Sequence, residues 1–113
     1  DSAQKRKEIV SQFHALQEKL AVLFGMEEGE HGLFEDILAL RPTEERRLDG
    51  LKEEHTALLT RCDSLSAKLD SPEESDFTEI CTEVSSLLVS FRAHENREDK
   101  LIELIYFVDE GGG

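Results

Sequence analysis

The sequence predicts an all-α protein, an up-down antiparallel bundle of long helices that forms one domain over residues 1–113. Apolar residues recur at alternating spacings of four and three along three segments, which is the pattern of a helix that packs in a bundle. The chain has only two prolines, so long helices can form without interruption. Its composition, 38% hydrophobic and 35% charged, is typical of amphipathic helices rather than of a disordered chain.

The first helical segment carries an apolar stripe that keeps its spacing throughout. The stripe consists of Ile9, Phe13, Leu16, Leu20, Leu23, Glu27, Glu30, Phe34 and Ile37. Arg41-Pro42-Thr43 then interrupts the helical pattern. Thr43, followed by two glutamates, predicts the N-cap of the next helix.

The second and third segments continue the same pattern. The second stripe consists of Leu48, Leu51, His55, Leu58, Cys62, Leu65 and Leu69. The third consists of Phe77, Ile80, Val84, Leu87, Phe91, His94, Glu98, Leu101, Ile105 and Val108. Between them, Asp70-Ser71-Pro72-Glu73-Glu74 predicts a turn, with Pro in the first turn of the next helix. Both connections are short, so we expect neighbouring helices to be antiparallel.

Each stripe is apolar at its ends and polar in its middle. Antiparallel packing through short turns would bring Glu27, His55, His94 and Glu98 to one level of the core. A buried carboxylate costs several kcal/mol unless something compensates its charge, and a divalent cation does so. Imidazole and carboxylate suit iron, manganese or zinc, and His94 and Glu98 stand four residues apart on one helix face. The sequence therefore predicts a metal site formed by these four residues across three helices.

The segments around these residues resemble the hemerythrin-like family of His-His-Glu cation-binding domains. The last helix of that family, where a His and a Glu four residues later bind iron, is similar to the run from Phe91 to Glu98. The family's third helix, which carries another ligand His, resembles the run from Leu51 to Leu59. Its second helix normally reads His-Phe-x-x-Glu-Glu and is similar to the run from Leu23 to Glu28.

The resemblance implies a non-haem iron site in the bundle core. By analogy His55 and His94 hold one iron, and Glu27 and Glu98 bridge to a second. Leu23 stands where the family has a ligand His, and the family's first helix has no counterpart in this chain. The resemblance therefore implies one ion rather than two. It also implies a small diatomic ligand, and a role in oxygen, nitric oxide or redox sensing or in iron handling.

Several alternatives stay open at this level. Glu30 and His31 follow the predicted site closely enough to join it. Three helices leave part of the core uncovered. A helix that preceded Asp1, a break of the first segment at Gly25–Gly32, or a second copy of the chain would account for this. Of the three, we expect the second copy, which forms a homodimer. A metal-free family member that acts as a helical interaction module is the second hypothesis for function. An enzyme that uses the same iron is the third, although no residue identifies a substrate.

Charge and cysteine content restrict the possible partners. A net charge of −13 disfavours binding to nucleic acid and to anionic membranes. No apolar run approaches the roughly 20 residues of a membrane-spanning helix. Cys62 and Cys81 are too few and too far apart for a disulfide framework or a CxxC site, so we expect two reduced thiols and a cytoplasmic protein.

Overall fold

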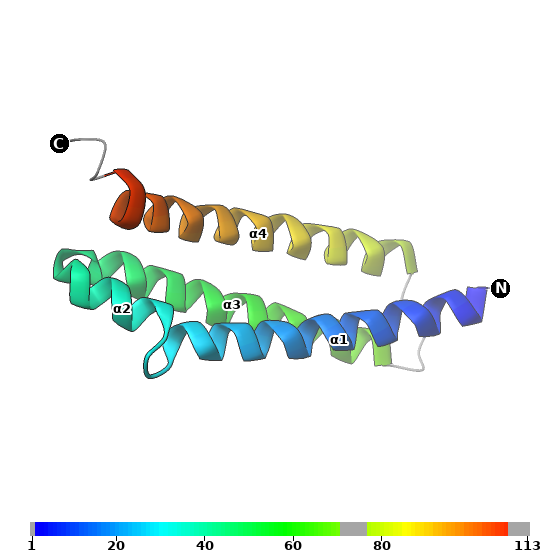
Figure 1. Ribbon diagram of the computed structural model, residues 1–113. Helices are drawn as coiled ribbons and strands as arrows, with labels where there is room; N and C mark the ends of the chain where they lie inside the picture. The colour runs from blue at the N-terminus through cyan, green and yellow to red at the C-terminus, as the bar shows by residue number, and fades with distance from the viewer. Residues whose placement is uncertain (1, 71–76, 109–113) are drawn as a thin grey trace.

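The computed structural model describes residues 2–70 and 77–108, and no strand occurs among them. The helices are α1 (Ser2–Glu28), α2 (Leu33–Leu40), α3 (Glu45–Asp70) and α4 (Phe77–Glu103). A 3₁₀ turn, η1 (Pro42–Glu44), precedes α3, and a π-helical turn, η2 (Leu104–Val108), follows α4. The three long helices lie antiparallel to their neighbours in an elongated bundle of 59 × 26 × 19 Å (Figure 1). The predicted all-α bundle is confirmed.

The first segment is broken where its stripe was predicted to continue. After α1 the chain turns, with a hydrogen bond from the Gly32 N–H to the Gly29 carbonyl at 3.0 Å and with His31 at a φ of 63°. A Cβ atom on Gly32 would collide with the backbone carbonyl oxygens of Met26 and Glu27. The continuous first helix is therefore wrong, because the chain breaks within the Gly25–Gly32 segment.

The break changes which stripe residues reach the core. Glu30 and His31 lie on the turn, and both side chains are 85% exposed. Phe34 and Ile37 return to the core, but from α2. The predicted N-cap at Thr43 is also wrong, because Thr43 lies inside η1 and no side-chain cap hydrogen bond precedes that turn. Residues 71–74 of the second predicted turn, and the side chain of Val108, lie outside what the structure describes.

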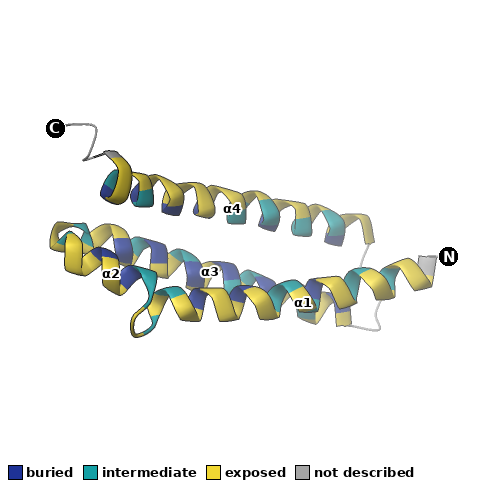
Figure 2. Ribbon diagram, in the orientation of Figure 1, coloured by how far each residue is buried: buried dark blue, intermediate teal, exposed yellow. Residues whose placement is uncertain are grey.

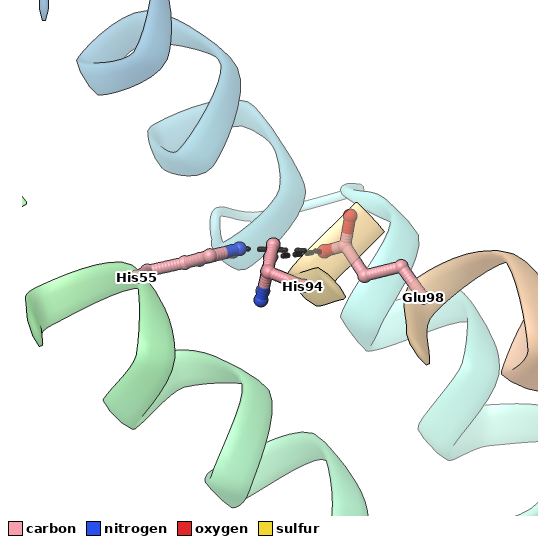
Figure 3. A group of neighbouring side chains, drawn as sticks. All are labelled: His55, His94 and Glu98. Carbon is pink, nitrogen blue, oxygen red and sulfur yellow. Dashed lines mark hydrogen bonds and ion pairs between the residues drawn. The ribbon is translucent and has the colours of Figure 1, made fainter. Parts of the chain in front are cut away.

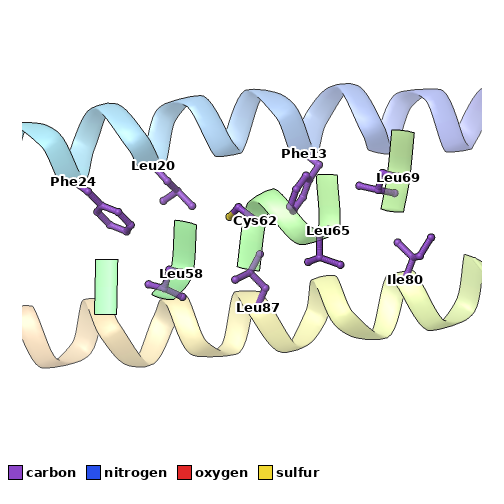
Figure 4. Close-up of a cluster of buried hydrophobic side chains, with 9 residues drawn as sticks. All are labelled: Phe13, Leu20, Phe24, Leu58, Cys62, Leu65, Leu69, Ile80 and Leu87. Carbon is purple, nitrogen blue, oxygen red and sulfur yellow. The ribbon is translucent and has the colours of Figure 1, made fainter. Parts of the chain in front are cut away.

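The helix α3 lies at the centre of the packing, with α1 against one side and α4 against another. Buried faces of the three helices point toward one another (Figure 2). The larger apolar cluster fills the half of the bundle near the start of α4 (Figure 4). It consists of Phe13, Leu20, Phe24, Leu58, Cys62, Leu65, Leu69, Ile80 and Leu87. A smaller cluster at the other end consists of Phe34, Ile37, Leu48, Leu51, Leu101 and Ile105.

One edge of the bundle is less well covered than the rest. A groove of about 340 Å³ runs between α1 and α4, and its apolar lining includes Ile9, Leu16, Val84 and Leu88. Leu23, predicted to face the core, is 43% exposed, whereas its neighbour on α1, Phe24, is 2% exposed. The stripe prediction is wrong at this position because α1 turns Phe13, Leu20 and Phe24 toward α3 and leaves Leu23 at the edge. The short α2 contributes Phe34 and Ile37 to the smaller cluster and does not line this groove.

No helix in the described ranges is both long enough and apolar enough to cross a membrane. Cys62 is a free thiol that is fully buried in the larger cluster, and Cys81 is a free thiol of intermediate exposure. Cys62 therefore packs as a small apolar residue of the core.

Candidate metal centre

The structure brings the four predicted ligands together between the two apolar clusters. His55 comes from the middle of α3, His94 and Glu98 from successive turns of α4, and Glu27 from the last turn of α1. Both histidine side chains are 1% exposed, and the side chains of Glu98 and Glu27 are 10% and 15% exposed. Figure 3 shows His55, His94 and Glu98 pointing toward one another from α3 and α4.

The Glu98 carboxylate lies between the two imidazoles. Its Oε2 atom is 3.3 Å from Nε2 of His55 and 3.3 Å from Nε2 of His94. Glu27 approaches from α1, with its Oε1 atom also 3.3 Å from Nε2 of His55. Ligand atoms of His55, His94 and Glu98 all lie within 4.8 Å of one another, which is close enough for a single ion to contact all three.

The other nitrogen of each imidazole is held by a further carboxylate. Nδ1 of His55 lies 2.7 Å from Oε2 of Glu28, and Nδ1 of His94 lies 2.6 Å from Oε1 of Glu54. An imidazole that donates its Nδ1–H outward presents the lone pair of Nε2 inward. Metal-ligating histidines almost always make such an outer hydrogen bond, because it fixes the tautomer and the ring orientation.

Aromatic rings pack around His55 and limit its movement. Phe24 of α1 stacks on the His55 ring with a centroid separation of 3.8 Å and an interplanar angle of 6°. Phe34 of α2 is near-parallel to the same ring, with a centroid separation of 5.4 Å. Phe24 also meets the edge of His94, with a centroid separation of 5.6 Å. These rings exclude water on the side of α1 and α2.

Without a metal the cluster forms a network of ion pairs. Burial opposes the charged form of His55, but hydrogen bonds with Glu27, Glu98 and Glu28 overcome it and raise its pKa to about 9. The pKa of His94 is also raised, because Glu98 and Glu54 outweigh burial and the nearby His55. Burial acts against ionisation of Glu98, yet the two histidines hold its pKa well below the usual range. His55 is therefore protonated at neutral pH when no cation is present, and the protonated form of His94 is favoured by the same carboxylates.

Two buried polar atoms of this network make ion-pair contacts at 3.3 Å but no hydrogen bond of good geometry. Nε2 of His94 and Oε1 of Glu27 have no solvent contact and no well-aligned hydrogen-bond partner among the described residues. Both atoms belong to the cluster, and each is a good ligand atom for a divalent cation. A bound ion would satisfy both and would replace the protons on the two imidazoles. The donor set therefore fits a metal ion, and it fits iron, manganese and zinc alike.

Sequence reasoning missed three residues that support the cluster: Phe24, Glu28 and Glu54. Glu28 and Glu54 each directly adjoin a predicted ligand, at Glu27 and His55, and so lie off the apolar stripes. The available signal was chemical, since a ligand His needs an outer acceptor and both glutamates stand beside the predicted level. Glu30 and His31, the two optional ligands, are exposed on the turn after α1 and do not join the cluster.

Comparison with family models, with curated proteins and with solved structures finds no match for this chain. The resemblance to hemerythrin-like domains therefore stays a prediction that depends on the residues quoted for it.

Proposed function

We propose that this chain is a hemerythrin-like metal-binding domain that holds one iron ion through His55, His94, Glu98 and Glu27. The observation that carries the proposal is the paired orientation of the two histidines. They come from different helices, yet both turn Nε2 toward the same buried carboxylate while a separate carboxylate holds each Nδ1. Metal-ligating histidines almost always donate their outer N–H to such a carboxylate, so the arrangement supports a metal site.

A single ion is favoured over a pair. Among the residues that the structure describes, the cluster of His55, His94 and Glu98 is the one group of three or more such ligands close enough to share an ion. Leu23, in the place of the family's further histidine, is partly exposed and offers no ligand atom. Four protein ligands leave coordination positions free on a six-coordinate iron, which supports binding of a small diatomic molecule. Oxygen, nitric oxide or redox sensing, or iron handling, follows as the proposed role.

A metal-free helical interaction module is the second candidate. It is favoured by the carboxylates themselves, because Glu98, Glu28 and Glu54 give both histidines ion-pair partners within the protein. The apolar groove between α1 and α4 and the exposed Leu23 would then serve a protein partner.

Metal analysis of protein expressed in iron-supplemented medium separates the two candidates. We expect about one iron per chain in the wild type and almost none in the double variant His94→Ala/Glu98→Ala. The matched control is Glu30→Ala/His31→Ala, which removes the same two side-chain types from the exposed turn and should keep the metal. Equal, substoichiometric metal in all three proteins would eliminate the metal-binding proposal.

A melting experiment with a chelator tests the same point in solution. An ion present at 100 times its dissociation constant stabilises the folded state by about 2.7 kcal/mol. Removing it should lower the melting temperature by roughly 10 °C or more in a domain of this size. The interaction module predicts an unchanged melting temperature.

A further inference from the structure

The Glu54 carboxylate is shared between His94 and an arginine. Oε1 of Glu54 accepts a hydrogen bond from Nδ1 of His94 at 2.6 Å and also lies 3.1 Å from Nε of Arg97. Nε of Arg97 is closer still to Oε2, at 2.8 Å. Both cations act against burial to hold the pKa of Glu54 below its usual value, so this carboxylate is ionised. Arg97 and His94 belong to α4 and Glu54 to α3, so the three groups connect the two helices beside the cluster.

We propose that Arg97 is a positioning residue for the metal centre, acting on His94 through Glu54. This inference rests on the proposed metal-binding function. The Glu54 side chain is 32% exposed and has several rotatable bonds, so a contact with His94 alone would leave it free to turn toward solvent. Nε of Arg97 contacts both carboxylate oxygens and restricts that rotation. Holding Glu54 in place keeps Nδ1 of His94 donating outward and Nε2 directed at Glu98.

The direction in which metal affinity changes when Arg97 is removed distinguishes a positioning role from a purely electrostatic one. A guanidinium near a bound dication repels it, so if Arg97 acted only through its charge, its removal would tighten metal binding. If Arg97 positions His94, its removal weakens metal binding although a repulsive charge is lost. The two mechanisms therefore predict opposite changes in affinity.

Co²⁺ affinity, measured by competition with a chelator, provides the test. We expect Arg97→Gln to weaken binding about 3–10-fold and Glu54→Gln to weaken it about 10–100-fold, in the range found for outer partners of metal ligands. Arg92→Gln, the same charge change at an exposed position of α4, should leave the affinity unchanged. Arg97→Lys keeps the charge but removes the Nε–H that contacts both oxygens of Glu54, so it should recover only part of the affinity.

A double-mutant cycle tests whether Arg97 acts through Glu54. In the Glu54→Gln background the Arg97→Gln change should have no further effect on Co²⁺ affinity. An effect of equal size in both backgrounds would overturn the inference, and so would an unchanged or tighter affinity in Arg97→Gln alone.

Nitrogen-15 NMR of metal-free protein gives a second reading that does not need the ion. The hydrogen-bonded Nδ1–H signals of His55 and His94 should both be present in the wild type and in Arg92→Gln. In Arg97→Gln the His94 signal should be lost to solvent exchange while the His55 signal stays. If wild-type protein binds no Co²⁺, the proposed function fails, and the NMR result still decides the role of Arg97. If wild-type protein binds Co²⁺ and the His94 signal survives in Arg97→Gln, the positioning role fails alone.

Discussion

The larger apolar cluster and the adjoining layer of histidines and glutamates lie in the same three helices but are stabilised by different forces. The apolar cluster gains from removing hydrocarbon surface from water, at about 25 cal/mol per Å². The polar layer loses its hydration, and the free-energy cost of that loss is offset only by the ion pairs around His55 and His94. Phe24 belongs to both regions, since it is buried in the apolar cluster and stacks on His55.

This difference explains why the polar layer points to function. Well-packed apolar residues in place of a buried ion pair are often as stable as the pair or more so. The larger cluster shows that the bundle already packs leucines at neighbouring levels of the same helices, for instance at Leu58 and Leu87. Apolar residues could have filled this layer, and two of its buried polar atoms lack a hydrogen-bond partner, which supports the proposed ligand.

Leu87→Ala should have the largest effect, because it should lower the stability of the fold and leave the metal site unchanged. Leu87 is 2% exposed in the apolar cluster, and a buried Leu→Ala change destabilises by about 2–5 kcal/mol. It lies two helical turns from His94, so the metal site should keep its affinity for Co²⁺. Urea unfolding measures the loss of stability, and chelator competition on the folded variant measures the affinity. Loss of Co²⁺ binding by a folded Leu87→Ala protein would show that the two regions are not independent.

The turn after α1 offers a second comparison, between two glycines. A Cβ at Gly32 would meet backbone carbonyl oxygens at the end of α1, so Gly32→Ala must displace the turn, and overpacking of this kind costs about 1–3 kcal/mol. Because one of those carbonyls belongs to Glu27, the variant should also weaken metal binding. Gly50→Ala is the matched control: nothing lies within 4 Å of its Cβ position in α3, and Ala is favoured over Gly in a helix by about 1 kcal/mol. Equal effects of the two changes in urea unfolding would contradict this account of the turn.

The sequence was a good guide to the fold and to the level of the candidate site. Spacing and short turns placed Glu27, His55, His94 and Glu98 together because antiparallel helices match residues by their distance from the connecting turn. The same reasoning carried the first stripe through Gly29–Gly32, because a repeating pattern does not reveal that the backbone turns there, with His31 at a positive φ and no room for a Cβ at Gly32.

The periodicity of the sequence could not predict which side chains hold the outer nitrogens of the two histidines. Glu54 supports His94 across two helices although it is a neighbour of His55 in the chain, and Arg97 joins it from the far side. A stripe identifies which residues face the core, but long side chains at its margin reach partners that spacing does not specify. Phe24 was missed for a related reason, since the helix is rotated slightly from the predicted stripe and buries Phe24 instead of Leu23.

The smallest expected effect concerns how stability depends on pH, which should run in opposite directions in the metal-free and the metal-bound protein. In the metal-free protein the pKa of His55 rises from 6.5 to about 9 on folding, so its ion pairs contribute fully below pH 6.5 and are lost as the pH rises through about 9. We expect metal-free stability in urea to fall by on the order of 1 kcal/mol between pH 7 and 9.5. Stability with Co²⁺ should instead rise over the lower part of that range, because the ligand imidazoles must lose their protons. His55→Phe should flatten the metal-free slope, whereas His14→Phe, at a half-exposed histidine, should keep it. Parallel slopes with and without Co²⁺ would mean that the ion does not bind through these imidazoles.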